Sequence, residues 1–216
     1  MTLQEAIYNR HSVRDYIDKP IEPSLAYELQ QEINAINKES GLNIQLVLNE
    51  KKAFSGLMAK YGKFSGVSNY IALVGSGKNL HERCGYYGER LVLKAQQLGL
   101  NTCWVYLTYK VVPSAIKKEK GERLVLVISL GYGKTQGKPR KSKSITKVSN
   151  ARDKTPEWFN NGVELALLAP TAMNQQKFKI LYQNGEVIFK SGVGVCTKID
   201  LGIVRCHFNS VKILKA

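Results

Sequence analysis

The sequence predicts an α+β fold in which helices flank a mixed sheet. Two observations lead to this prediction. Segments with a helical spacing of apolar residues alternate with short runs rich in β-branched residues along the 216 residues. Asn184-Gly185 separates two such runs, which is typical of a type I′ hairpin and argues against a purely parallel sheet.

The chain is expected to begin with two helices. Thr2 and Glu5 form a capping box, so a short helix is predicted from Leu3 to about Asn9. A second helix is predicted from Ser24 to about Lys38, because apolar residues recur there on one face. Gly41 follows as its C-terminal signal.

The remaining elements alternate. A strand is predicted at 43–48, where Ile44, Leu46 and Leu48 alternate, and a third helix is marked by Phe54, Leu57 and Met58. The pattern then predicts strands at 69–75, 102–107 and 123–131 and helices at 82–98 and 113–121. After a basic connector at 133–154, it predicts a helix with Pro156 at its first position, the hairpin at 177–190, and a last helix at 198–212.

The formal net charge of +15 indicates a nucleic acid partner, an anionic cofactor, or only a demand for solubility. The connector, from Gly133 to Lys154, is the densest basic stretch of the chain. Its composition fits either a solvated linker or a segment that contacts a phosphate. The N-terminus has no apolar signal region and no apolar run is long enough to span a bilayer, so a cytoplasmic protein is expected. The four cysteines lack C-x-x-C spacing and are expected to be reduced.

Several common motifs are missing or incomplete. The fragments GSGKN and GYGKT do not meet the pattern G-x-x-x-x-G-K-[ST], which argues against a P-loop. No G-x-G-x-x-G opens a helix after a strand, and no G-x-S-x-G marks a nucleophile elbow. The three histidines are scattered, so no metal site is predicted.

The stretch RHSVRDY places two guanidinium groups and a hydroxyl directly after the first helix. Arg10, Ser12 and Arg14 at this spacing suit a phosphate, because Arg offers forked charged donors and Ser a short one. The alternative is that these cations only complement the negative end of a helix dipole.

The same stretch resembles the R-x-S-x-R-x-[FY] motif of the nitroreductase family, flavin enzymes that bind FMN. Three further segments resemble that family: the helix and strand at 87–105, the strand and basic segment at 125–142, and LAPTAMNQQKF at 168–178. The last is similar to the family's A-P-S-x-x-N-x-Q-P-W loop, which normally follows soon after the R-x-S motif. Here it comes after the connector.

The end of the chain suggests a reason for this order. KIDLGIVRCHF resembles a truncated copy of the helix that contains CGYYGERLVL, with Gly202 in the place of Gly85. The resemblance therefore implies a nitroreductase-like full unit at 1–150 with the phosphate motif. A partial second unit at 151–216 then supplies the APTAMNQQ loop, so that one chain mimics the family's dimer (a pseudo-dimer).

The resemblance also assigns roles. The cofactor-binding residues it implies are Arg10, His11, Ser12, Arg14 and Arg140 for the phosphate end, with Lys138 or Lys141 beside Arg140, Lys63 near the flavin's pyrimidine edge, Leu107 and Thr108 at the central turn, and Pro170, Thr171, Asn174 and Gln176 on the second side. Neutral amides can match the donors and acceptors of a flavin edge. An alternative for Asn174 is that it only braces its own loop, and for Lys63 that it is a surface lysine. No catalytic side chain and no metal are expected.

Two departures concern the substrate pocket more than the cofactor. WVYLTY replaces the glycines that often follow the family's central strand, and Lys177-Phe178 replaces Pro-Trp. The resemblance implies an FMN-dependent oxidoreductase in which NAD(P)H reduces the flavin and a nitroaromatic, quinone or similar electron-poor acceptor reoxidises it, in a monomer or homodimer. The alternative is a non-catalytic flavin-binding protein or a basic nucleic-acid binder. The latter lacks interleaved aromatic residues.

Overall fold

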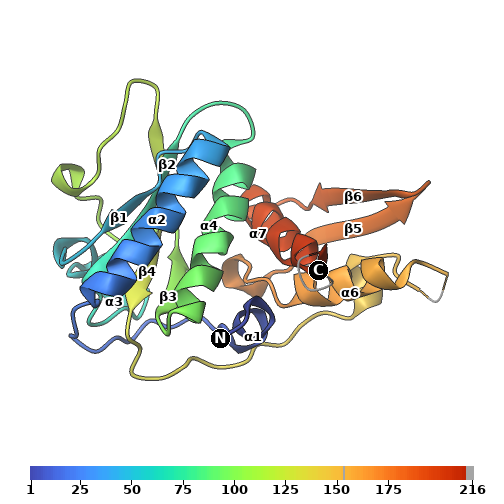
Figure 1. Cartoon of the computed structure of the whole chain (residues 1–216), viewed down its shortest axis with the longest axis horizontal. Coiled ribbons are helices and arrows are strands. Elements are labelled where there is room, and N and C mark those ends of the chain that lie inside the picture. Colours follow the sequence, from blue (N-terminus) through green and yellow to red (C-terminus); the bar gives the residue numbers. More distant parts are fainter. Residues whose placement is uncertain (153, 213–216) are drawn as a thin grey trace. The chain divides into compact units, whose positions relative to one another are not determined.

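The computed structural model describes residues 1–152 and 154–212, which fall into two compact units (Figure 1). The first unit comprises residues 1–80 and 91–139. The second comprises residues 81–90 and the chain from Arg140 onward. The family resemblance implied a boundary after residue 150, with residues 81–90 in the first unit. No helix in the described part of the chain is long and apolar enough to cross a membrane.

The first unit is built on a four-stranded sheet with the strand order β1-β2-β4-β3. Its strands are β1 (Gln45–Val47), β2 (Asn69–Gly75), β3 (Asn101–Val105) and β4 (Arg123–Gly131). All three ladders are antiparallel. The α+β class is therefore confirmed, but the expected mixed sheet is corrected. Parallel pairing occurs among the described residues only in isolated bridges.

Two of the predicted helices appear where their terminal signals placed them. α1 (Leu3–Asn9) begins at the predicted capping box, and α2 (Pro23–Ser40) ends at Gly41, whose φ is 64°. The central helix, α4 (Leu80–Gln97), is also close to its predicted range. Lys94 in its second half pairs with Glu28 of α2 at 3.0 Å, so these two helix segments run side by side along the sheet (Figure 1).

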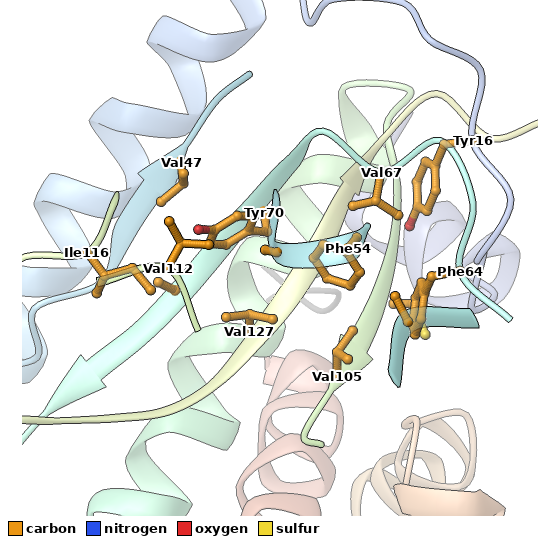
Figure 2. Packing of buried hydrophobic residues seen from close by; sticks show 14 of the residues in the cluster. Tyr16, Val47, Phe54, Phe64, Val67, Tyr70, Val105, Val112, Ile116 and Val127 are labelled. Atoms are coloured by element: carbon orange, nitrogen blue, oxygen red, sulfur yellow. The ribbon is translucent and has the colours of Figure 1, made fainter. Parts of the chain in front are cut away.

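The core of the first unit gathers aromatic and β-branched side chains from distant parts of the chain (Figure 2). Phe54 packs edge-on against Phe64, with ring centroids 5.2 Å apart, and lies 6.1 Å from the ring of Tyr70. Every residue of β2 is buried, because both faces of this central strand are covered. This rigid core positions the residues that precede and follow the strands.

The predicted helix at 113–121 does not form. A single 3-10 turn, Pro113–Ala115, stands there, and the chain then runs extended. The side chain of Gln45 explains this: its amide nitrogen donates to the Lys117 carbonyl at 2.6 Å, and its oxygen accepts from the Lys117 N–H at 2.8 Å. These two bonds hold Lys117 as a strand partner would and remove it from any helical ladder.

Two further predictions were wrong in detail. The predicted third helix is divided into the 3-10 turn Lys52–Phe54 and a short α3 (Leu57–Tyr61), with Leu57 and Met58 exposed. In the first strand the expected alternation fails, because Val47 is buried while Leu48 lies beyond the strand end and is exposed. Both faces of the sheet are covered, so periodicity could not identify a buried face.

The second unit is a helix, a hairpin and a helix, preceded by the short α5 (Ile145–Val148). Its elements are α6 (Glu157–Leu167), β5 (Phe178–Gln183), β6 (Glu186–Ser191), α7 (Thr197–Asn209) and a terminal 3-10 turn, Ser210–Lys212. Pro156 is the N-cap of α6 rather than its first residue. Asn184 and Gly185 have φ values of 53° and 84°, which confirms the predicted type I′ turn.

Aromatic packing holds the hairpin to the helices within this unit. Phe208 of α7 lies 5.2 Å from Phe189 of β6 and 5.7 Å from Phe159 of α6 (centroid to centroid). Trp158 contacts Tyr182 of β5 at 6.0 Å. An isolated two-stranded hairpin is only marginally stable in water, so this cluster is what fixes β5 and β6.

The N-terminal half of α4 belongs to the second unit and crosses α7 at two glycines. A Cβ on Gly85 would lie 2.1 Å from the carbonyl oxygen of Ile199, three residues before Gly202. A Cβ on Gly202 would lie 2.0 Å from the carbonyl oxygen of Glu82, three residues before Gly85. The crossing is thus reciprocal, and it requires glycine on both helices.

Candidate functional site

The predicted phosphate motif lies in an extended segment directly after α1. Arg10 is the C-cap of that helix and is only 2% exposed. The backbone of Ser12 forms a bridge with Thr102 of β3, and the N–H of Ser65 donates to the carbonyl of Arg14 at 3.0 Å. Backbone contacts on both edges therefore fix the positions from which the motif's side chains project.

Three side chains of the motif gather at a buried thiol that no sequence pattern indicated. Burial raises the pKa of Cys103, while the positive charge of Arg14, a hydrogen bond with Ser12 and the charge of Arg10 oppose that rise. The guanidinium of Arg14 also lies over the ring of Phe64, 5.9 Å from its centroid. Arg10, Ser12 and Arg14 are thus neighbours in space as well as in sequence.

The beginning of the basic connector runs against this motif. Gly137 has a φ of 79°, and a Cβ there would lie 2.6 Å from the Cβ of His11 and 3.1 Å from the carbonyl oxygen of Ser12. The N–H of Lys134 donates to the carbonyl of Asp15 at 2.9 Å, and their side chains form an ion pair at 2.9 Å. The connector is therefore not a free linker here, and it brings basic residues to the motif.

The residue before Lys63 lies against Thr108 within the first unit. Lys63 follows α3 with a φ of 59°, and its side chain is exposed. A Cβ on the preceding Gly62 would lie 2.6 Å from the hydroxyl oxygen of Thr108. Leu107 is exposed in the same turn, which begins directly after β3. Seven predicted site residues (Arg10, His11, Ser12, Arg14, Lys63, Leu107 and Thr108) thus belong to the first unit.

The other five predicted residues (Arg140, Pro170, Thr171, Asn174 and Gln176) belong to the second unit, on or beside the loop between α6 and β5. We call residues 168–177 the amide loop. Pro170 is buried, and the loop contains the 3-10 turn Ala172–Asn174. Arg140 donates through Nη2 to the carbonyl of Leu167 at 3.4 Å. The second part of the connector therefore lies along the start of this loop.

The amides of the loop bind the connector. Gln176 is 3% exposed; its Nε2 donates to the Lys141 carbonyl at 2.9 Å, and its Oε1 accepts from the Lys143 N–H at 2.8 Å. Asn174 is exposed; its Nδ2 donates to the same Lys141 carbonyl at 2.9 Å, and its Oδ1 accepts from Gln176 at 2.8 Å. These bonds favour a bracing role for Gln176. They leave Asn174 a second amide hydrogen and lone pair for another partner.

A buried acid that no motif indicated holds the opposite side of the loop. Asp200 of α7 accepts from the Ala172 N–H through Oδ1 at 2.9 Å and from Gln175 Nε2 through Oδ2 at 2.7 Å. Burial raises its pKa to about 6, although both hydrogen bonds act in the lowering direction. The available sequence signal was weak: one acidic residue within the apolar helical stretch KIDLGIV.

The twelve predicted residues therefore form two local groups, one in each unit. That both groups contact one ligand remains a prediction. Within residues 1–152 and 154–212, no cluster of three or more His, Cys, Asp or Glu side chains could hold a metal ion.

Comparison with known proteins identifies the family. A family model described as "Putative TM nitroreductase" matches residues 2–211. A solved structure titled as a putative nitroreductase from Thermotoga maritima is 27% identical, with a TM-score of 0.69, and the match covers all of this chain and 86% of that one.

More distant structures share the fold. A nitroreductase family protein from Streptococcus pneumoniae is 16% identical, with a TM-score of 0.55, over 70% of this chain and all of that one. A protein from Parabacteroides distasonis titled as a putative NADH dehydrogenase/NAD(P)H nitroreductase is 20% identical, with a TM-score of 0.53, over 68% of this chain and 95% of that one. No protein with a curated function matched. The family match spans nearly the whole sequence, and the chain belongs to the nitroreductase family so described.

Proposed function

We propose that this protein is an FMN-dependent oxidoreductase that uses NAD(P)H to reduce nitroaromatics, quinones or similar electron-poor acceptors. The observation that carries the proposal is that a chain of this family holds Arg10, Ser12 and Arg14 together at one place. The end of the chain that carries the amide loop supplies a second group of polar residues. Bound FMN supplies the hydride and electron transfer, and the protein supplies binding and electrostatics.

The residues of the first unit fit the phosphate end of such a cofactor. A guanidinium as buried as that of Arg10 is uncommon, and Arg is the residue best shaped to bind a phosphate through two parallel hydrogen bonds. The backbone at Gly137 approaches His11 and Ser12 so closely that only glycine fits. In the proposed site these groups hold the phosphate, with Arg140 from the second unit and Lys138 or Lys141 nearby.

The ring of the cofactor is assigned to the turn and the loop. Lys63 directly follows Gly62, whose backbone lies against Thr108, and in the proposed site its cation would stabilise negative charge as the ring is reduced. From the second unit, Thr171 and Asn174 are assigned to the ring; Thr171 Oγ1 accepts from the Gln176 N–H at 3.1 Å and Asn174 is exposed. Gln176 then acts by fixing the loop, a change from the direct contact that the resemblance implied.

The two-unit arrangement supports the idea that the second unit is a partial copy of the first. The same spacing of 117 residues separates Gly85 from Gly202, and also Asn79 from Cys196, the left-handed residues that precede α4 and α7. β2 and β6, which lead into these helices, begin 117 residues apart as well. This correspondence of strand, turn and helix is what a duplicated segment predicts, and it supports a chain that mimics the family's dimer.

The test is a flavin titration of the purified protein. We expect a yellow protein, or one that takes up FMN in preference to FAD, and FMN-dependent oxidation of NADH or NADPH on addition of a quinone or nitroaromatic. FMN binding without turnover would leave the non-catalytic flavin-binding alternative. No FMN binding, together with salt-sensitive binding to DNA, would favour the nucleic-acid alternative.

A further inference from the structure

The amide loop is held in a conformation that ordinary residues avoid. Met173, Asn174 and Gln176 all have positive φ values, of 52°, 53° and 45°. Such left-handed conformations are unfavourable for residues other than glycine and persist only where surrounding contacts impose them. Contacts around the amide loop must therefore hold these three residues in place.

Two sets of hydrogen bonds enclose the loop from opposite sides. On one side, Asn174 and Gln176 bind the connector backbone at Lys141 and Lys143. The second set centres on the carboxylate of Asp200, with one oxygen on the backbone of Ala172 and the other on the side chain of Gln175. The tip between the two sets carries Met173, which is 100% exposed.

Burial of this acid needs a reason. Asp200 is 3% exposed, and a buried carboxylate is retained where its bonds are needed. Its two oxygens are each directed to a donor of the amide loop rather than to a cation. Gln175 in turn also donates to the carbonyl of Val195, just before α7, at 2.9 Å. The loop is thus fastened to the start of α7 at three points.

We propose that Asp200 is a positioning residue that fastens the amide loop to α7 and so holds Thr171 and Asn174 in place for the ligand. This inference rests on the proposed function for the identity of that ligand, FMN, but the fastening itself does not depend on it.

The fastening is coupled to the ionisation of Asp200. Burial raises its pKa to about 6, so the closed loop favours the protonated acid over the carboxylate relative to an open, solvated loop. The loop side faces it with an N–H and an amide, which do not titrate. Among the described residues, the thiol of Cys196, just before α7, interacts with it, and burial and the charge of Asp200 raise the pKa of that thiol to about 11. Lys177, the charged residue of the amide loop, donates through Nζ to the carbonyl of Val193 at 3.2 Å. The loop should therefore open more easily as pH rises through about 6.

The experiment compares hydrogen exchange and FMN affinity in the full-length protein. Asp200→Ala removes both of its bonds from the α7 side, and Gln175→Ala removes one of them from the loop side, together with the bond to Val195, without altering the helix. Glu164→Ala, an exposed acid on α6, is the matched control. We expect exchange in residues 168–177 and the Kd for FMN to rise about tenfold in the two test variants, and neither to change in the control.

Exchange in the hairpin at 178–191 reports whether the second unit is still folded. If hairpin exchange also rises in Asp200→Ala, that variant has lost its fold, and the loop exchange of Gln175→Ala is used to test the fastening instead. In wild type, loop opening corrected for intrinsic exchange should increase from pH 5 to 7.5, and Asp200→Asn should abolish that dependence. An acid that does not contact the loop would not make loop opening depend on pH in this way.

The outcomes separate the two proposals. Unchanged loop exchange in folded variants refutes the fastening. A loosened loop with an unchanged Kd refutes the positioning role while leaving FMN binding intact. Failure of the wild-type protein to bind FMN refutes the proposed function and the positioning for FMN, and the exchange data then still decide whether Asp200 fastens the loop.

Discussion

Replacing Gly202 by alanine should destabilise the second unit. The added Cβ would lie 2.0 Å from the carbonyl oxygen of Glu82 and 2.7 Å from the amide nitrogen of Tyr86. Both are backbone atoms of a helix and cannot rotate away. Because nonbonded atoms make favourable contact only near about 3.5 Å, α4 and α7 must move apart by roughly 1.5 Å. That movement disturbs the close packing of the unit.

The expected loss in the free energy of unfolding follows from two opposing effects. Overpacking of this kind costs about 1–3 kcal/mol, and a clash with backbone belongs at the upper end. Alanine is a better helix former than glycine by about 1 kcal/mol. The free energy of unfolding of the second unit should therefore fall by about 2 kcal/mol. Gly85→Ala should behave alike, since its Cβ would meet the carbonyl of Ile199 at 2.1 Å.

Urea denaturation followed by tryptophan fluorescence measures this. The chain has two tryptophans. In a Trp104→Phe background, Trp158, which packs against Tyr182 and Phe208, reports on the second unit. Gly56→Ala is the control, because nothing lies within 4 Å of its added Cβ and its φ of −90° suits alanine. If Gly202→Ala unfolds at the same urea concentration as wild type and the control, the close crossing of α4 and α7 is wrong.

Three further changes test other parts of the structure. Arg10→Ala should weaken FMN binding by about 1.5–3 kcal/mol relative to Arg152→Ala, and equal affinities at moderate salt would remove Arg10 from the site. The pKa of Asp200 is about 6 in the folded protein, above its ordinary value of 3.8. The contribution of Asp200 to the free energy of unfolding is therefore complete below pH 3.8 and is lost as the pH rises through about 6. Unfolding at pH 5 should then cost about 1.4 kcal/mol more than at pH 7.5, a difference that Asp200→Asn should remove and that calorimetry can measure. His207→Ala should lower the melting temperature, because its fully buried ring nitrogens bind Glu89 at 2.8 Å and the Leu165 carbonyl at 3.1 Å; an unchanged melting temperature would contradict this.

Local signals in the sequence predicted the elements that local chemistry determines. The capping box of Thr2 and Glu5, the left-handed Gly41 and the Asn184-Gly185 turn each act within a few residues, and each is found as expected. The helix predicted at 113–121 failed because Gln45, far away in the chain, supplies its own hydrogen bonds to Lys117. No window of neighbouring residues contains that information.

The candidate site also contains residues that the sequence could indicate and residues that it could not. Arg10, Ser12 and Arg14 could be predicted as candidates because they lie within five residues and match a family motif. Asp200 could not, since its role depends on contacts with Ala172 and Gln175 across the α7–loop junction. In the sequence it is a single acid in an apolar helix. Burial and partners, which only the fold supplies, distinguish it from a solvated surface acid.

Several elements of the second unit contact the amide loop or lead into it. α6 leads into the loop and β5 leads out of it, α7 fastens it through Asp200, and the connector fastens it through Lys141 and Lys143. The first unit has a four-stranded sheet and the second a two-stranded hairpin, which the aromatic cluster around Phe208 packs on the helices. In the proposed function, two helices and a hairpin are therefore enough to position the loop, while the phosphate is assigned to the first unit with its four-stranded sheet.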